Sequence, residues 1–359
     1  MIASDRHDYS LIGPCAQAAA QEGLVAAEWY HTDVPRKRMK ELMRRRDWPA
    51  ARDTLIWFGL LAGFAFGAYW FWDSWWCAPF FLCYGVLYGS ASDSRWHETG
   101  HGTAFRTSWV NDAIYQVASF MNMKEPTLWR WSHARHHTDT IIVGRDREIA
   151  AMRPPDLLRI VPNLLCLTEL VHTSASVVRH AAGHLTEVEQ TFIPRSEQHK
   201  VVREARAWIG VYAIVVAACI YFDSILPALF IGLPTLYGFW LGYLFGLSQH
   251  AGLAENVLDH RLNSRTIRMN RVARFIFWNM NFHVEHHMFP MVPYHALPEL
   301  HAEVAHDMPA PYGSLLGAYR EIVPTLWRQL REPQYHVERE LPACAKPFRP
   351  ELHEVVFQS

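Results

Sequence analysis

The chain has 359 residues, with 34 Lys and Arg against 35 Asp and Glu, so its formal net charge is −1. This balance excludes a strongly cationic nucleic-acid binder, and an apolar content of 50% excludes disorder over most of the length. The six cysteines form no CxxC pair, which argues against a cysteine zinc site and a disulfide framework. The 21 histidines are the unusual feature, because imidazole titrates near neutrality and binds metals.

The first predicted elements are a basic N-terminal segment, residues 1–53, and an apolar hairpin, residues 54–92. Residues 54–72 carry no charge and are long enough to cross most of a hydrocarbon core about 30 Å thick. Asp73 and Ser74 separate them from a second uncharged run, residues 75–92. We therefore expect two transmembrane helices joined by a short turn.

A long polar segment, residues 93–206, follows the first hairpin. Its apolar stretch 157–178 is interrupted by charged residues and a proline, so we expect it to lie on the membrane surface. A second hairpin is predicted at residues 207–249, with spans 207–222 and 225–249 around Asp223 and Ser224. Residues 250–331 are again polar, and residues 332–359 are expected to form an irregular C-terminal tail.

The positions of Lys and Arg predict the orientation, because all 34 lie outside the four spans. By the positive-inside rule both termini and residues 93–206 face the cytoplasm. Residues 1–20 show no cleavable signal peptide. The predicted fold is an all-α integral membrane protein, with four transmembrane helices in two hairpins and a cytoplasmic helical cap.

Three histidine clusters have metal-ligand spacing. Side chains three and four residues apart share one face of a helix, so each cluster can present several imidazoles to one point. Eight imidazoles exceed the needs of one ion, so the cap is predicted to hold two metal ions. A ninth candidate, His250, ends the fourth predicted span. The eight clustered histidines are His97 and His101 in HETGH, His133, His136 and His137 in HARHH, and His283, His286 and His287 in HVEHH.

Other histidines are expected to be structural or to lie behind the ligands. His172, His180 and His184 fall on or beside the surface stretch, and His295, His301 and His306 follow the third cluster.

Three other classes of protein fit the same residues less well. HETGH also fits the zinc-protease pattern HExxH, with Glu98 as general base, but that reading leaves six clustered histidines unexplained. ExxH spacing occurs at Glu98–His101 and Glu303–His306, as in soluble di-iron bundles, which need further inward carboxylates. A metal transporter would place ionisable residues inside its spans, and these spans contain almost none.

With its three boxes, four spans and the run NMNFHVEHHMFPMVPYHALPELH, the chain resembles the membrane fatty acid desaturase and hydroxylase superfamily over about residues 55–306. The resemblance implies a non-haem di-iron centre with O2 as co-substrate. The implied iron ligands are the eight box histidines, and His250 matches the additional ligand at the end of the fourth span.

The resemblance implies that the protein is a desaturase, which introduces a double bond into a fatty acyl or lipid-like substrate. The HxxHH form of the second box favours this reaction. Hydroxylation of an alkane, carotenoid or other lipid-like substrate on the same scaffold stays open, because the sequence does not decide between the two.

Ligating histidines usually donate their second N–H to a nearby acceptor, which orients the ring. From their positions near the boxes, six residues are predicted to provide such acceptors. They are Glu98, Asp112, Asp139, Asn279, Asn281 and Glu285.

Electrons are expected to come from a separate carrier with its reductase, because the sequence has neither an HPGG haem motif nor a CxxC pair. A ferredoxin, a rubredoxin or a free cytochrome b5 would serve as the carrier. The lack of a fused electron donor and of an organelle retention signal favours a bacterial inner membrane as the location. A basic face is predicted to suit an acidic carrier or to anchor the chain at the membrane surface. It comprises Arg261, Arg265, Arg268, Arg271 and Arg274.

Overall fold

The computed structural model describes residues 8–353, and its regular elements are all helical, which confirms the all-α prediction. Within that range two isolated β-bridges occur, Thr266 with Phe282 and Ile267 with Tyr312, but no strand. The longer helices are α1 (Pro14–Gln21), α3 (Asp47–Trp70), α4 (Cys77–Gly85), α5 (Ala91–Gly100), α6 (Ser108–Met121), α7 (Pro126–Thr138), α9 (Leu167–Ala181), α11 (Gln198–Tyr221), α14 (Trp240–His250), α18 (Leu297–Val304) and α19 (Leu315–Gln329).

Shorter elements connect and cap these helices. The α-helical ones are α2 (Arg36–Leu42), α8 (Leu157–Ile160), α10 (Glu187–Gln190), α12 (Leu226–Phe230), α13 (Pro234–Gly238), α15 (His260–Asn263), α16 (Arg271–Ile276) and α17 (His283–Met288). A π-helical segment, η1 (Val86–Ser90), joins α4 to α5, and 3-10 turns occur at η2 (Pro162–Leu165), η3 (Ala305–Asp307) and η4 (Pro350–Leu352).

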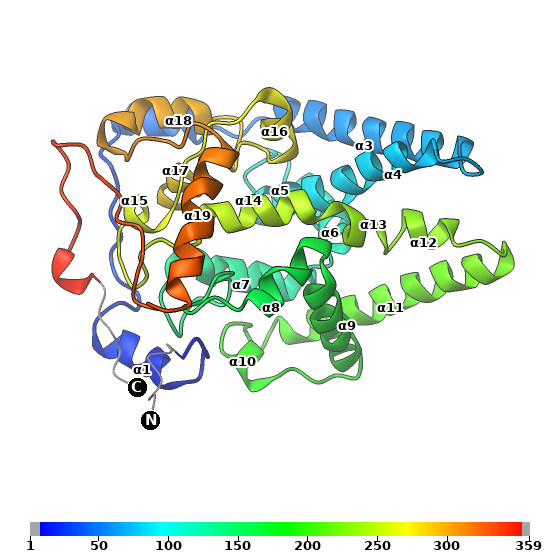
Figure 1. The fold of residues 1–359 in the computed structure, drawn as a ribbon, viewed down its shortest axis with the longest axis horizontal. Helices are drawn as coiled ribbons and strands as arrows, with labels where there is room; N and C mark the ends of the chain where they lie inside the picture. The colour runs from blue at the N-terminus through cyan, green and yellow to red at the C-terminus, as the bar shows by residue number, and fades with distance from the viewer. Residues whose placement is uncertain (1–7, 354–359) are drawn as a thin grey trace.

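The first predicted hairpin corresponds to α3 and α4, which lie side by side and project from the body of the molecule (Figure 1). Helix α3 begins at Asp47, earlier than the predicted span. From Cys77 the chain stays helical through α4, η1 and α5 to Gly100. The second predicted span is therefore continuous with the helix that carries the first histidine box.

The second hairpin differs from the prediction of two uninterrupted spans. Its first arm is the long helix α11, but its second arm is divided into α12, α13 and α14 (Figure 1). Gly232 has a φ of 98°, in the left-handed region that favours glycine, and Pro234 has no N–H to donate to a helix. These two residues account for the break between α12 and α13.

By length and apolar composition, one helix of the described chain, α11, is suited to cross a membrane. The stretches Leu157–Leu165 and Leu167–Ala181 pass the same test only as a pair, bent by 87°. The predicted surface stretch therefore contains a sharp corner. The arrangement of four spans stays a prediction.

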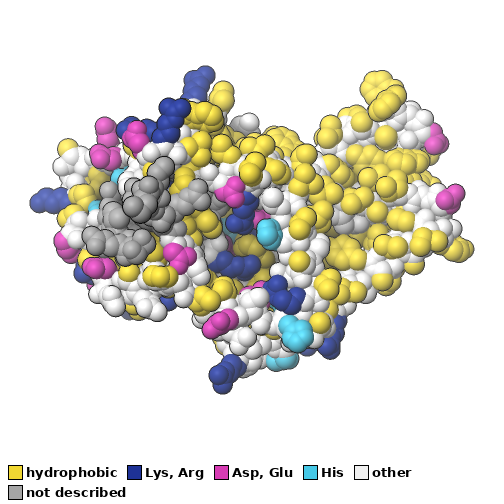
Figure 2. Space-filling view, turned by 60° about the horizontal axis from the view of Figure 1, so that its bottom comes forward, with side chains coloured by type: hydrophobic (Ala, Val, Ile, Leu, Met, Phe, Trp, Pro, Cys, Tyr) yellow, Lys and Arg dark blue, Asp and Glu magenta, His cyan; other side chains and the backbone are white. Residues whose placement is uncertain are grey.

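Large apolar side chains are exposed along the projecting helices. On α3 the exposed fractions are 68% for Leu55 and 64% for Phe66, and on α11 they are 70% for Ile214 and 76% for Ile220. Figure 2 shows hydrophobic side chains covering this end of the molecule, while most of the charged ones lie elsewhere on the same face. Soluble monomers rarely expose apolar surface on this scale.

The two hairpins meet where backbone approaches backbone. A Cβ built on Gly238 of α13 would collide with the carbonyl group of Gly85 at the end of α4. Beside this contact, the Ser90 hydroxyl donates to the Gly238 carbonyl at 2.5 Å and accepts from the Gly242 N–H at 2.8 Å. Glycine is needed at position 238 because any side chain would push the two hairpins apart.

Replacing Gly238 with alanine is expected to lower the stability of the protein by about 1–3 kcal/mol, the usual effect of overpacking a rigid contact. The matched control is Gly63→Ala in α3, since a Cβ there has no neighbour within 4 Å. Thermal unfolding in detergent measures both variants. Equal melting temperatures for the two would show that this contact relaxes freely.

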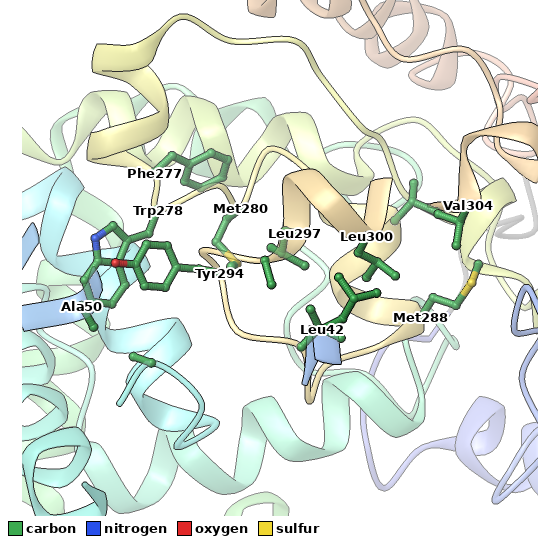
Figure 3. Close-up of a cluster of buried hydrophobic side chains, with 14 of the residues drawn as sticks. Leu42, Ala50, Phe277, Trp278, Met280, Met288, Tyr294, Leu297, Leu300 and Val304 are labelled. Carbon is green, nitrogen blue, oxygen red and sulfur yellow. The ribbon is translucent and has the colours of Figure 1, made fainter. Parts of the chain in front are cut away.

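A core of buried side chains supports the third histidine box (Figure 3). Helix α17 has six residues, too short to be stable by itself, and Val284 and Met288 anchor it among apolar side chains from α2, α3 and α18. Trp278 and Tyr294, on either side of α17 in sequence, stack with ring centroids 4.2 Å apart. Tertiary packing therefore holds the third box in its helical form.

Candidate metal centre

Four separate stretches of chain bring the predicted ligands together. Helix α5 carries His97 in its last turn, with His101 at its C-cap, and α7 carries the second box. Helix α14 ends at His250, and α17 consists of the third box and Met288. These helices converge in the middle of the molecule (Figure 1).

All nine predicted ligand histidines lie in two compact groups. Within each group the nearest ring nitrogens lie within 4.8 Å of one another. The rings are buried or half-buried, with exposed fractions of 0% for His286 and 1% for His283. The first group comprises His97, His101, His133, His137 and His286, and the second comprises His136, His250, His283 and His287.

The histidine doublets divide between the two groups. In the second box His137 joins the first group and His136 the second, while in the third box His286 joins the first and His287 the second. Adjacent residues on a helix point about 100° apart, so one doublet can serve two centres. Residues four apart stay together, as His133 with His137 and His283 with His287 do. This division explains why both boxes end in two consecutive histidines.

The nitrogen spacing fits metal coordination. Four Nε2–Nε2 distances in the first group are 2.8–3.2 Å, and two in the second are 2.9 and 3.0 Å. Ligands bound at about 2.1 Å lie about 3.0 Å apart at right angles and about 3.4 Å apart in a tetrahedron. Five imidazoles also exceed the four ligands of tetrahedral zinc. The donor set therefore fits two ions, at least one of them with more than four ligands.

Burial keeps most of these imidazoles neutral. It lowers the pKa of seven of them well below 6.5, and repulsion between neighbouring rings adds to the shift; the seven are His97, His101, His137, His250, His283, His286 and His287. At His136 burial also lowers the pKa, but the carboxylate of Asp146 outweighs it and the net shift is upward. A neutral ring offers a nitrogen lone pair to a metal.

Four of the nine rings are oriented through their Nδ1 atoms. Asp146 Oδ2 lies 2.8 Å from Nδ1 of His136, and Glu148 Oε2 lies 3.0 Å from Nδ1 of His133. The other two acceptors are the Asn263 carbonyl, 2.8 Å from His250, and the Thr140 hydroxyl, 3.2 Å from His287. In His133, His250 and His287 this contact leaves Nε2 beside the Nε2 atom of another ring in the same group.

Sequence reasoning missed these orienting residues. Asp146 and Glu148 follow the second box within one turn-rich segment, and this acidic pair was the available signal. Asn263 acts through its backbone carbonyl, which no side-chain pattern reveals.

The six predicted orienting residues have other partners in the structure. Asp112 pairs with Arg130 at the surface, and Asp139 pairs with Arg145 and Arg135. The Asn279 side chain joins Arg274 to the Tyr294 carbonyl, and Asn281 donates to the Ile267 carbonyl. Glu285 accepts from Thr266 and contacts His301, and Glu98 accepts from Thr103 and the Tyr294 N–H. These six residues lie near the boxes in sequence, but the fold turns their side chains toward partners outside the two histidine groups.

The position of Glu98 bears on the metalloprotease alternative. A general base of that class must face the metal, whereas the Glu98 carboxylate is fully buried against Thr103 and Tyr294. Burial raises its pKa to about 7. His97 and His101 instead share their group with histidines from both other boxes. The geometry therefore disfavours a zinc protease site at HETGH.

His180 has a structural role within a buried ionic cluster. Its Nδ1 lies 2.8 Å from Glu125 Oε1 and its Nε2 lies 3.1 Å from Glu189 Oε2. Burial lowers the pKa of His180, but hydrogen bonds to the two carboxylates outweigh it and raise the pKa to about 9. His180 is therefore charged in the folded protein at neutral pH.

Stability is expected to fall as pH rises from about 6.5 to about 9. A folded-state pKa above the unfolded value stabilises the protein fully below the unfolded pKa, and the effect is lost as pH rises through the folded one. Melting temperatures across this range test the effect. His180→Gln should flatten the profile, and the exposed control His184→Gln should leave it unchanged. A flat profile for the unmodified protein would contradict the assignment.

A further histidine, His260, lies beside the second group although it belongs to none of the three boxes. It stacks on Trp29 with ring centroids 4.3 Å apart, and its ring lies 5.1 Å from that of His287. Burial, together with repulsion from nearby histidines, lowers its pKa to about 3. His260 is thus a neutral ring packed against the second group.

The predicted basic face needs correction. Arg261 and Arg265 are buried, with exposed fractions of 0% and 1%. Arg261 pairs with Asp259 and Asp307, and Arg265 pairs with Glu321. Arg268 and Arg271 are exposed, and Arg274 is half-buried. Long-range acidic partners draw the first two arginines inward, so the face consists of the last three.

The fold and the site define a class: an all-helical protein in which imidazoles from four segments form two adjoining groups that could each hold a metal ion. The family model for fatty acid desaturases matches residues 73–318. The chain therefore belongs to the fatty acid desaturase family, a family of oxidoreductases.

Two curated relatives are similar to this chain at 22% identity. One is an endoplasmic-reticulum omega-3 fatty acid desaturase of Vigna radiata var. radiata, aligned over 276 residues that cover 69% of this chain and 68% of the relative. The other is a chloroplastic sn-2 acyl-lipid omega-3 desaturase (ferredoxin) of Arabidopsis thaliana, aligned over 268 residues. That alignment covers 69% of this chain and 58% of the relative.

Proposed function

We propose that this protein is a membrane-bound, O2-dependent di-iron desaturase that introduces a double bond into a fatty acyl or lipid-like substrate. The observation that carries the proposal is the convergence of nine histidines into two adjoining groups. Membership of the desaturase family and the names of both relatives support it.

Iron is the proposed metal because the chemistry that it supplies when bound, activation of O2 to remove hydrogen from an unactivated C–H bond, lies beyond side-chain acids and bases. The residues that would hold it are the nine histidines of the two groups. Asp146, Glu148, Thr140 and the Asn263 carbonyl fix the ring orientations.

The chain also provides a place for the substrate. A cavity of about 210 Å³ borders both groups, with His97 and His133 of the first and His136, His250 and His283 of the second in its wall. Trp96, Phe239 and Leu247 add apolar surface. An apolar chain in this cavity would exclude water and lie beside both groups.

Membrane association is proposed from the apolar side chains exposed on α3 and α11. We further propose a bacterial inner membrane, with both termini and the histidine site on the cytoplasmic side. Electrons are proposed to come from a separate ferredoxin, rubredoxin or cytochrome b5 with its reductase. One relative carries ferredoxin in its name, which favours the first of these.

The test combines metal analysis with product analysis. Protein expressed with iron-57 and purified in detergent is examined by Mössbauer spectroscopy, then incubated with reduced ferredoxin, O2 and membrane lipid. We expect two coupled irons per chain and a product two hydrogens lighter than the substrate. A product one oxygen heavier would identify a hydroxylase, and one zinc without iron would overturn the oxidase assignment.

A further inference from the structure

A second, apolar space adjoins the cavity beside the histidine groups. A groove of about 520 Å³ lies between α9 and α11, lined by apolar residues that include Val177, Trp208 and Val216. Met123 and Thr173 belong to the walls of both spaces. The two spaces therefore meet at these two side chains, and a long-chain molecule that passes between them would reach from the exposed α9–α11 surface to the histidine groups.

The cavity wall carries four basic side chains, and three of them have acidic partners. Lys124 pairs with Asp93 at 2.7 Å. Arg159 pairs with Glu169 at 3.2 Å, and Arg153 with Glu255 at 3.6 Å. The remaining acid in the wall, Glu148, contacts Ser132 and the ligand ring of His133.

Arg147 is the fourth basic residue, and within residues 8–353 it has no ion-pair partner. Its Nη1 atom is buried and lacks a hydrogen-bond partner. The guanidinium lies over two rings, 4.9 Å from the centroid of Trp129 and 5.6 Å from that of Phe192. Burial lowers the pKa of Arg147, and the carboxylates of Glu148, Glu189, Glu169 and Glu125 lie near enough to offset part of that shift. None of the four forms an ion pair with the guanidinium, and a buried charge without a direct partner is costly. The site therefore favours a ligand with one negative charge.

We propose that Arg147 binds the carboxylate of a free long-chain fatty acid whose apolar chain lies past Met123 and Thr173 in the α9–α11 groove. A guanidinium fork matches a carboxylate. One unpaired cation balances one charge, which favours a carboxylate over a doubly charged phosphate monoester. The inference rests on the proposed function only in taking this ligand to be the substrate.

The test is equilibrium binding of matched amphiphiles to the iron-loaded protein, without O2 or reductant. Labelled palmitate, hexadecanol and hexadecyl phosphate have equal chains and different head groups. The unmodified protein should prefer palmitate to hexadecanol. Arg147→Gln should reduce palmitate affinity by about 10–100-fold, as expected for a lost charge-assisted hydrogen bond, and leave hexadecanol binding unchanged.

The matched control is Arg159→Gln, because Arg159 lines the same cavity and already has an acidic partner. It should change palmitate affinity less than about 2-fold, as for other surface ion pairs. Arg147→Lys should give an intermediate affinity, because it keeps the charge and loses the fork. Comparing variants removes the contribution of partitioning into detergent, which is the same for all of them.

Equal binding of palmitate and hexadecanol by the unmodified protein would overturn the inference, whatever the variants do. Tighter binding of hexadecyl phosphate would overturn the choice of a carboxylate. If Arg147→Gln loses iron, the head-group preference of Arg147→Lys decides instead. Selective palmitate binding without oxidation would support this site while the proposed desaturase reaction fails, so the two failures are distinguishable.

Discussion

Replacing His283 with alanine is expected to release one metal ion and to reduce turnover by more than about 100-fold. His283 belongs to the group with four imidazoles, and its Nε2 lies 2.9 Å from that of His250 and 3.0 Å from that of His287. Loss of a residue behind a ligand already costs 10–100-fold, so loss of a ligand should cost more. Metal analysis of the purified protein and a desaturation assay measure the two effects.

The matched control is His184→Ala, which removes an exposed histidine outside both groups. This control should keep its full metal content and its rate. Because His283 is buried, thermal unfolding should be compared for both variants to show that the protein still folds. Retention of both ions and unchanged turnover in His283→Ala would exclude this residue from the metal centre.

Asp146→Asn is expected to weaken metal binding at the second group by about 10–100-fold. Its carboxylate accepts from His136 Nδ1 at 2.8 Å and from the Ile141 N–H at 2.9 Å. The substitution keeps the shape but removes the charge that holds the His136 ring with Nε2 toward the group. Titration of the metal-free protein with ferrous iron under anaerobic conditions measures the affinity.

Asp112→Asn provides the control for this experiment. Asp112 follows the first box in sequence, yet it forms an exposed pair with Arg130 at 3.0 Å. Its replacement should change iron affinity less than about 2-fold, because exposed pairs contribute little. If Asp112→Asn weakened binding as much as Asp146→Asn, the positions assigned to the two carboxylates would be wrong.

All nine histidines that the sequence singles out lie in the two groups. The box histidines could be recognised in the sequence because their spacing is a local property of helices. His133 and His137, or His283 and His287, share a helix face wherever the helix is placed. The all-helical class was likewise predictable from the long apolar runs. The break at Gly232 and Pro234 could also have been predicted, because both residues disfavour a continuous helix, but they lie within an uninterrupted apolar run.

The orienting residues were not predictable from proximity in sequence. Glu98 and Glu285 lie inside boxes, yet the Glu98 carboxylate accepts from the backbone N–H of Tyr294 and the Glu285 carboxylate contacts His301. Asp146 and Glu148 reach the rings of His136 and His133 because the chain that follows α7 folds back against this helix. Which acceptor faces which ring depends on that local chain path.

The sequence by itself determined the number of clustered imidazoles and the helical spacing that brings the members of a cluster onto one face. Only the tertiary structure decided how the nine divide between two centres, since that depends on how α5, α7, α14 and α17 meet. It also decided that Arg261 is buried against Asp259 and Asp307, while Arg147 lines the cavity and forms no ion pair within the described residues. Spacing along a helix is fixed by its geometry, whereas pairing between distant segments is fixed only when the whole core packs.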